Sequence, residues 1–487
     1  MNQESIDYFS KKVEELIDGI DRGDFSKEII PDKYKWEHLL GLFILKDSLD
    51  GGEELFRQLY DLSIRSAENY IRQKAERGEK IIVAFQSYSA AQWPAVGVYR
   101  AFEKDLRFET KVLVSPLADR DKESIIDSYN NTLKWFLENG YRTVEGMDKA
   151  RSRFLGWEDF GKYPDVLYQL SSWFNNMAEN QWFTRLPLRC LVAYIPYGMY
   201  IADSKDGSYA KQLLYNKEMF NVMWRIYCDS ADSFRGFQKY ELLKGKNVRY
   251  SGYAKMDYFF EEHTFSEIEL RNLWKIPENN RIENTKRIII APHYSVSDRG
   301  VIQYSTFHKN LWFLLYLAEK YRDSVSFVLK PHPNLRYFAV GNGLFKSYED
   351  YDDYLKKWDD LSNGKVVQEA DYLEYFQTSD AMIMDSGSFL AEYLYVRKPL
   401  LYLTRPEQAF LDVGWRIIDS YYSTPGENYA GIEDFIVSVV LQGNDIKRED
   451  REKIFIQEYD YKKTNGKSAA DYISEDVFDL VSERRGL

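Results

Sequence analysis

Short, continuous apolar runs alternate with longer amphipathic stretches along most of the chain. The run Ile81–Phe85 is apolar throughout, which is typical of a strand buried on both faces of a parallel sheet. Comparable runs occur at residues 111–114, 166–168, 191–195, 224–228 and 248–250. Helical patterns at about 93–102 and 126–139 separate the first of these runs. The alternation predicts βαβ units and a doubly wound sheet.

A second series of the same kind follows the polar stretch Pro277–Asn284, which we interpret as a surface loop. Its apolar runs lie at residues 287–292, 325–330, 365–367, 381–384 and 400–403. A helical pattern at about 309–321 lies between the first two runs. The sequence therefore predicts an α/β fold with two Rossmann-like domains facing across a cleft. Ligands are expected in that cleft, at the carboxyl ends of the strands.

Both ends of the chain show helical periodicity instead. At 487 residues the chain exceeds the size at which a single hydrophobic core keeps growing. We predict an N-terminal helical region at 1–77, Rossmann-like domains at 78–255 and 256–430, and C-terminal helices at 431–487. The segment Lys255–Asp257 is interpreted as a hinge between the domains.

Charge and cysteine usage narrow the class of protein. The net charge is −12 and no cluster of Lys and Arg forms a basic stripe, so we expect no nucleic-acid partner and at most peripheral membrane contact. Cys190 and Cys228 lie in unrelated contexts, which favours a reducing compartment over a disulfide framework. The N-terminus does not resemble a signal peptide, and no apolar run is long enough to span a bilayer. We expect a cytoplasmic protein, either free or at the inner face of the membrane.

The most informative motif is Asp385-Ser386-Gly387-Ser388, which follows the apolar run 381–384 and precedes a helical pattern. Backbone N–H groups at such a helix start, two hydroxyls and the helix dipole favour a phosphate or pyrophosphate. Glu392 lies about one turn further on and is expected to reach a hydroxyl of a ribose or polyol. The alternative is an ordinary helix cap, because Asp and Ser are preferred there in any case. We favour the phosphate site because a second candidate lies at another strand end.

That second candidate is the segment Lys330-Pro331-His332-Pro333, at the end of the run 325–330. Proline fixes φ and lowers the entropy of the loop, so the imidazole is held where the strand ends. His332 is expected to donate to a phosphate or to act as a general acid or base, with Lys330 beside it. The alternative is a histidine of the surface.

A third strand end carries His293, Ser295 and Arg299, and we expect these side chains to line the same cleft. In the first half of the chain, Gln86 and Ser87 follow one apolar run. Tyr197 and Gly198 follow another, and all four residues are candidates for contact with an acceptor. Turn chemistry explains these last two segments equally well.

Metal and cofactor chemistry is not expected. No set of His, Asp and Glu recurs at ligand spacing, so we predict no metal site and no cofactor. The Walker A and Gly-x-Gly-x-x-Gly patterns are also absent, which argues against a nucleotide triphosphatase and a dinucleotide oxidoreductase.

At these motifs the chain resembles the CDP-glycerol glycerophosphotransferase family, the teichoic acid primases and polymerases. The resemblance rests on Ala291-Pro292, on Lys330–Pro333, and on Ser379–Ser388 with the helix that follows. It implies a GT-B fold whose first domain binds the acceptor and whose second binds a CDP-polyol donor. It also implies that CMP is released, that His332 assists at the donor phosphate, and that Ser386–Ser388 hold the pyrophosphate.

The family polymerases carry a Trp-His-Gly motif whose histidine serves as the base toward the acceptor hydroxyl. The comparable strand end here reads Ile195-Pro196-Tyr197-Gly198 and has no histidine. From the resemblance we expect transfer of a phospho-polyol, with glycerol phosphate as the first candidate, to a glycan or lipid-linked acceptor of cell-surface polymer synthesis. Two alternatives stay open: a GT-B glycosyltransferase that uses a sugar nucleotide, and a non-catalytic nucleotide-binding homologue that has lost the acceptor base.

Overall fold

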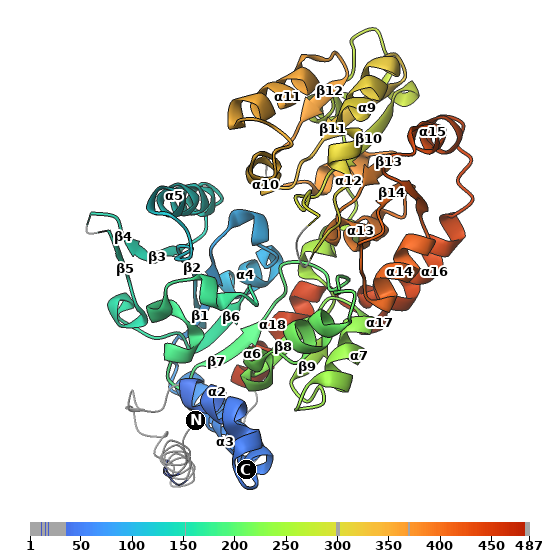
Figure 1. Cartoon of the computed structure of the whole chain (residues 1–487). Helices are drawn as coiled ribbons and strands as arrows, with labels where there is room; N and C mark the ends of the chain where they lie inside the picture. The colour runs from blue at the N-terminus through green and yellow to red at the C-terminus, as the bar shows by residue number, and fades with distance from the viewer. Residues whose placement is uncertain are drawn as a thin grey trace. The chain divides into compact units, whose positions relative to one another are not determined.

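The chain folds into two compact units. The computed structural model describes residues 36–150, 152–298, 302–368 and 371–482, together with positions 11, 15 and 18. Unit 1 comprises Met1–Gly198, Gln212–Asp257 and Tyr461–Leu487, and unit 2 comprises Met199–Lys211 and Tyr258–Asp460 (Figure 1). The division after Asp257 falls at the segment interpreted as a hinge.

A parallel sheet of seven strands forms the centre of unit 1, in the order β3-β2-β1-β6-β7-β8-β9. Its strands are β1 (Ile81–Ser87), β2 (Phe108–Val114), β3 (Thr143–Glu145), β6 (Val166–Gln169), β7 (Leu191–Tyr194), β8 (Arg225–Cys228) and β9 (Val248–Tyr250). Every residue of β1 is buried, as its continuous apolar run predicts. The strands β4 (Met147–Asp148) and β5 (Arg153–Phe154) form a separate antiparallel pair.

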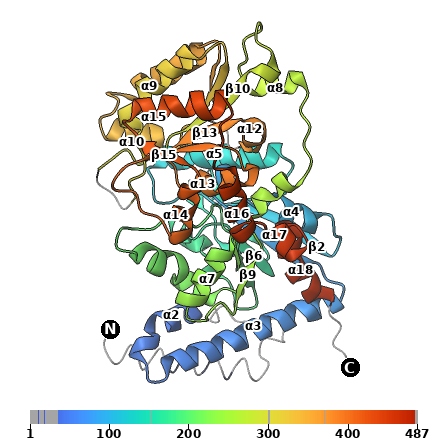
Figure 2. The same cartoon turned by 90° about the vertical axis from the view of Figure 1, so that its right-hand side faces the viewer.

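Helices from three parts of the chain cover this sheet. They are α2 (Trp36–Leu45), α3 (Gly52–Glu76), α4 (Val96–Glu103), α5 (Lys122–Glu138), α6 (Glu218–Val222), α7 (Ala231–Tyr240), α17 (Tyr461–Asn465) and α18 (Ala469–Ser482). The C-terminal helix α18 packs against α3 and α4 (Figure 2). Its Phe478 ring lies 5.1 Å from that of Phe102 and 5.4 Å from that of Phe108. The last helix therefore completes the core of unit 1.

Unit 2 contains a second parallel sheet, of six strands in the order β12-β11-β10-β13-β14-β15. Its strands are β10 (Lys286–Ala291), β11 (Val325–Leu329), β12 (Gly364–Val366), β13 (Ala381–Met384), β14 (Leu400–Thr404) and β15 (Tyr422–Pro425). The residues of β11 and β13 are all buried. Its helices are α8 (Glu267–Leu273), α9 (Phe307–Lys320), α10 (Leu335–Gly341), α11 (Tyr348–Asp360), α12 (Leu373–Thr378), α13 (Ser388–Glu392), α14 (Asp412–Asp419), α15 (Tyr429–Asp434), α16 (Arg448–Glu458) and the π-helix Phe435–Leu441.

One segment of unit 2 comes from the connection that follows β7. We call Met199–Lys211 the arm. The N–H of Leu411 donates to the carbonyl of Ile201 over 2.9 Å, and the N–H of Asp203 donates to the carbonyl of Ala409 over 3.3 Å. The arm is thus held to unit 2 by backbone hydrogen bonds, although the flanking residues on both sides belong to unit 1.

The predicted α/β class with two parallel sheets is confirmed. Separate helical regions were expected at 1–77 and 431–487. In the structure, α2, α3, α17 and α18 belong to unit 1 and residues 431–460 belong to unit 2. Residues 1–35 lie outside the described part of the chain, apart from three single positions. Among the described helices, none has an apolar stretch long enough to cross a membrane.

Candidate functional site

Three neighbouring strands of unit 2 end side by side. β10 lies between β11 and β13, and the register pairs Ile290 with Leu329 and Ala291 with Met384. The strands β11 and β12 extend the sheet on one side of β10, whereas β13 begins the other side. Such a reversal of strand order opens a crevice at the carboxyl ends of the strands. The three motifs predicted from the sequence all lie at this point.

Backbone hydrogen bonds hold the β10 and β11 ends together. The N–H of Lys330 donates to the carbonyl of Ile290 over 2.8 Å, and the N–H of His332 donates to the carbonyl of Pro292 over 3.1 Å. The imidazole centroids of His293 and His332 are consequently 5.2 Å apart. The ring of Tyr294 lies 4.6 Å from that of His332. The structure thus brings both predicted catalytic histidines into one cluster.

Asp385, at the end of β13, fixes the loops on either side of it. One carboxylate oxygen accepts the N–H of His293 at 2.7 Å. The other accepts the N–H of Thr306 at 2.5 Å and the hydroxyls of Thr306 and Ser305 at 3.0 and 3.3 Å. Burial raises the pKa of Asp385 to about 6, even though these hydrogen bonds favour the charged form. Its carboxylate acts on the backbone around the site, so a contact of Asp385 with a donor phosphate would be indirect.

His293 is held as a neutral ring. Its Nδ1 accepts the backbone N–H of Ser295 at 3.3 Å and lies 2.7 Å from the Ser295 hydroxyl oxygen. Burial, and secondarily the charge of His332, holds the pKa of His293 well below its usual range. A neutral imidazole whose Nδ1 accepts a hydrogen bond carries its proton on Nε2. His293 is therefore a hydrogen-bond donor through Nε2.

His332 has the same tautomer for the same reason. Its Nδ1 accepts the backbone N–H of Asn334 at 3.1 Å. Burial and the adjacent charge of Lys330 lower the pKa of His332 to about 4. The ring is consequently neutral near pH 7, with its proton on Nε2. This arrangement suits donation to an anion and does not suit a base that titrates near neutrality.

Lys330 and Glu392 belong to a buried polar group beside the histidines. Lys330 is 8% exposed, and its Nζ lies 5.7 Å from the centroid of the Tyr372 ring. The hydroxyl of Tyr372 donates to a carboxylate oxygen of Glu392 in a short hydrogen bond. Glu392 is 2% exposed. The predicted contact of Glu392 with a polyol or ribose hydroxyl would have to compete with Tyr372.

The segment Ser386–Ser388 leads from the end of β13 into a short helix. α13 begins at Ser388 and ends at Glu392, and no side-chain hydrogen bond caps it at Gly387. A Cβ placed on Gly387 would lie 3.2 Å from the ring of Tyr304, so glycine allows this close approach. Ser386 is half-buried. Arg299, the remaining donor candidate, lies outside the described residues.

Of the four predicted acceptor residues of unit 1, two are buried and two are half-buried. Gln86 is 1% exposed, and its amide donates to the Ser115 hydroxyl oxygen at 3.0 Å and to the Gln181 carbonyl at 2.9 Å. Ser87 is 3% exposed and donates to the Ser89 carbonyl. Tyr197 and Gly198 are half-buried, and the Tyr197 carbonyl accepts the hydroxyl of Tyr253 at 2.6 Å.

A further strand end, that of β6, lies next to Gln86 and Ser87 and was not predicted as a candidate site from the sequence. The sheet order of unit 1 also reverses, between β1 and β6. The residues after β6 read Leu170-Ser171-Ser172-Trp173. The Tyr88 hydroxyl lies 3.1 Å from the Ser171 hydroxyl oxygen, so the two strand ends meet. The sequence signal for this site was the polar and aromatic turn directly after an apolar run.

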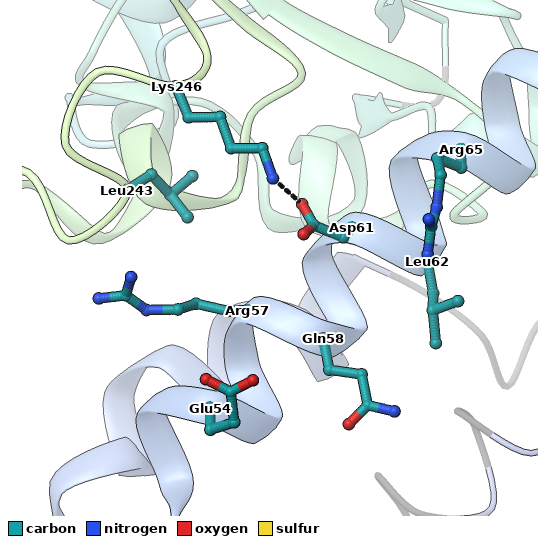
Figure 3. Close-up of a pocket in the computed structure, with 8 residues that line it drawn as sticks. All are labelled: Glu54, Arg57, Gln58, Asp61, Leu62, Arg65, Leu243 and Lys246. Atoms are coloured by element: carbon teal, nitrogen blue, oxygen red, sulfur yellow. Dashed lines mark hydrogen bonds and ion pairs between the residues drawn. The ribbon is translucent and has the colours of Figure 1, made fainter.

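A cavity of about 480 Å³ elsewhere in unit 1 contains none of the predicted site residues. It lies between α3 and the segment Leu243–Lys246, and Lys246 forms an ion pair with Asp61 across it (Figure 3). Besides this ion pair, the lining holds the cations of Arg57 and Arg65 and one carboxylate, that of Glu54. Within the described ranges, no group of three or more His, Cys, Asp and Glu side chains is placed to hold a metal ion.

No family model matches the chain, and no curated protein matches it. Among solved structures, a variant of the wall teichoic acid polymerase TagF aligns with 86% of this chain and 94% of its own, at 12% identity and a TM-score of 0.52. The TagF variant soaked with CDPG covers 85% and 94%, again at 12% identity and a TM-score of 0.52. A UDP-GlcNAc 2-epimerase from Neisseria meningitidis bound to UDP-GlcNAc covers 82% and 100%, at 15% identity and a TM-score of 0.47. The likeness to TagF, together with the two parallel sheets, shows that the chain has a GT-B-like fold.

Proposed function

We propose that the chain is a transferase that moves a phospho-polyol from a CDP-activated donor to a glycan or lipid-linked acceptor, with glycerol phosphate as the first candidate for the transferred group. The observation that carries this proposal is the cluster of His293, His332 and Lys330 at the strand-order reversal of unit 2. Two neutral N–H donors and one cation match the chemistry of a pyrophosphate. The fold shared with a TagF variant soaked with CDPG supports the same donor class.

In the proposed reaction an acceptor oxygen attacks the β-phosphorus of the donor. The bond from this phosphorus to the bridging oxygen breaks, and CMP leaves. Charge accumulates on the phosphate oxygens, where the Nε2–H groups of both histidines and the ammonium of Lys330 stabilise it. Asp385 keeps the His293 backbone in place. Each transfer releases CMP and one proton.

The role of His332 in this proposal is narrower than the general acid or base expected from the sequence. An imidazole with a pKa of about 4 is a weak base near neutrality, and its Nδ1 already accepts a hydrogen bond from the Asn334 N–H. His332 therefore acts as a hydrogen-bond donor to the phosphate. The proton of the acceptor hydroxyl has to pass to another group.

Ligand-dependent stabilisation and CMP release test the proposal together. Thermal unfolding is followed with CMP, CDP, CDP-glycerol, UDP, UDP-sugars and GDP. A ligand at 100 times its Kd stabilises by about 2.7 kcal/mol. We expect the cytidine nucleotides to raise the melting temperature and CDP-glycerol to yield CMP with a polyol-phosphate acceptor. Preference for uridine or guanosine ligands would instead indicate a sugar-nucleotide glycosyltransferase, and binding without CMP release a non-catalytic homologue.

A further inference from the structure

A lysine of unit 1 lies at the point where β1 and β6 end. Lys217 precedes α6 and is half-buried. Its ammonium donates to the carbonyl of Ser172 in a short hydrogen bond, and its Nζ lies 4.0 Å from the centroid of the Trp173 ring. Ser172 and Trp173 follow directly after the β6 end. The cation is thereby fixed at the strand-order reversal of unit 1, the kind of place where α/β sheets bind ligands.

The local hydrogen bonds make this place rigid. The N–H of Trp173 donates to the Ser171 hydroxyl oxygen at 3.1 Å. The same hydroxyl lies 3.1 Å from that of Tyr88, which follows β1. Trp173 is half-buried. The carboxyl ends of two strands, an indole face and an ammonium group therefore meet within unit 1.

Among the described residues, the half-buried ammonium of Lys217 lacks the carboxylate partner that such a group usually has. Across the described ranges of the chain, no carboxylate forms an ion pair with it, and its contacts are a carbonyl and an aromatic face. Burial lowers the pKa of Lys217 to about 8, while the charge of Glu218 opposes this shift. A cation that is desolvated without a counter-ion is costly. An anionic ligand would remove that cost, and the ammonium has N–H donors left to bind it.

We propose that Lys217 binds the phosphate of an acceptor that carries a polyol phosphate, at the β1–β6 end of unit 1, with Trp173 as the wall on which the polyol or sugar packs. This inference rests on the proposed function, because it names the acceptor class of that transferase. It also differs from the sequence expectation, which placed acceptor contacts at Gln86, Ser87, Tyr197 and Gly198. The phosphate of a soluble polyol and that of a lipid-linked one present the same chemistry to Lys217.

The test measures binding of sn-glycerol 3-phosphate by calorimetry between pH 6.5 and 9.5, with saturating CMP to occupy the donor site of unit 2. Glycerol is the uncharged control ligand. Wild type, Lys217→Met, Lys217→Arg and Lys104→Met are compared, because Lys104 is an exposed lysine of the same unit. Vesicles of phosphatidylglycerol, against phosphatidylcholine, test the lipid-linked source in parallel.

Binding that needs the charged amine has a defined pH dependence. Above pH 8 the amine of wild type loses its proton, so affinity should fall by up to tenfold per pH unit. The affinity of Lys217→Arg should not change over this range, because arginine keeps its charge. Lys217→Met should bind at least tenfold more weakly than wild type at pH 7. The control variant Lys104→Met should match wild type. Preference for the soluble ligand or for the vesicles then assigns the source of the phosphate.

Equal binding by wild type and Lys217→Met, or a wild-type affinity that is flat to pH 9.5, would overturn the inference. CMP release from CDP-glycerol is measured on the same proteins, so that failure of this inference and failure of the proposed function can be told apart. CMP release together with phosphate binding that ignores Lys217 refutes this inference alone. Phosphate binding that depends on Lys217 without CMP release refutes the proposed transferase alone.

Discussion

The hydroxyl of Tyr461 donates to the carboxylate of Asp257 over 2.7 Å. Asp257 is the last residue of the middle segment of unit 1 and Tyr461 is the first residue of its C-terminal segment, so this hydrogen bond joins the two segments. The same carboxylate accepts the N–H groups of Ala469 and Ala470 at 2.8 Å each. Asp257 is therefore the cap of α18 and the attachment point of the C-terminal segment. A Cβ on Gly252, whose φ is +82°, would lie 1.9 Å from the Tyr461 ring, so the ring packs directly on this backbone.

Replacing Asp257 with alanine should release the C-terminal segment from unit 1. The change removes the acceptor of two backbone N–H groups and leaves the Tyr461 hydroxyl only the Tyr253 carbonyl at 3.4 Å, at an expected cost of about 2–4 kcal/mol. Hydrogen exchange should become faster across residues 461–482, whereas the strands of unit 2 should keep their protection. Asp479→Ala is the matched control, because Asp479 is an exposed carboxylate on the same helix. Similar exchange in the two variants would show that Asp257 does not hold the segment.

The second prediction separates hydrogen-bond donation by His332 from acid–base catalysis. His332→Ala should lower CMP release by about 10²–10³-fold, the usual effect of removing one donor to transition-state charge, with little loss of stability. His332→Gln offers an amide N–H that does not titrate and should retain part of the activity. Because the pKa of His332 is about 4, the pH profile of CMP release by His332→Gln should parallel that of wild type between pH 5 and 8. A bend near pH 6.5 that only wild type shows would contradict the donor role.

The third prediction concerns the pH dependence of stability through Asp385. Its pKa is about 6 in the folded state and about 3.9 in an unfolded chain. The folded protein therefore binds more protons between pH 4 and 6, and this group makes the protein less stable as the pH rises through that window. Thermal unfolding of wild type relative to Asp385→Asn should show a loss of about 2 kcal/mol between pH 4 and 6, with only a few tenths of a kcal/mol more up to about pH 7 and no change beyond that. A constant difference across this range would mean that Asp385 is ionised throughout.

Much of the sheet architecture could be predicted because buried parallel strands are apolar on both faces. The run at 381–384 became β13 with the same bounds, and the run at 81–85 became β1 with two more residues. The edge strands β3 and β15 were missed, since their residues are half-buried or exposed and β15 contains a proline. The arm could not be predicted, because its association with unit 2 depends on tertiary hydrogen bonds and leaves no periodic pattern.

The candidate site could be predicted in its location more than in its chemistry. Polar residues after apolar runs indicated strand ends, and those of β10, β11 and β13 are indeed neighbours. The protonation states of His293 and His332 depend on burial and on backbone N–H groups, which the sequence does not reveal. Lys217 escaped notice because it meets Trp173 only through the fold.

The last prediction follows an aromatic stack that supports His293. The Tyr304 ring lies parallel to that of Phe410 at 4.8 Å, and its hydroxyl donates to the Ala409 carbonyl at 2.9 Å. The N–H of Tyr304 donates to the Ser295 hydroxyl oxygen, which itself lies 2.7 Å from Nδ1 of His293. Phe410 also pairs with Ala202 of the arm. Movement of the stack should therefore move the histidine.

Phe410→Leu keeps most of the volume but loses the flat ring, so we expect about 1 kcal/mol of destabilisation and a roughly tenfold loss of affinity for CDP, about 1.4 kcal/mol. Phe345→Leu is the control, since Phe345 is 8% exposed, close to the 6% of Phe410, and packs between helices of the same unit. Calorimetry with CDP and thermal unfolding on both variants separate the two effects. Because the variants should lose similar stability, a loss of CDP affinity confined to Phe410→Leu identifies the stack as a positioning element. Equal losses in both would reduce it to ordinary core packing.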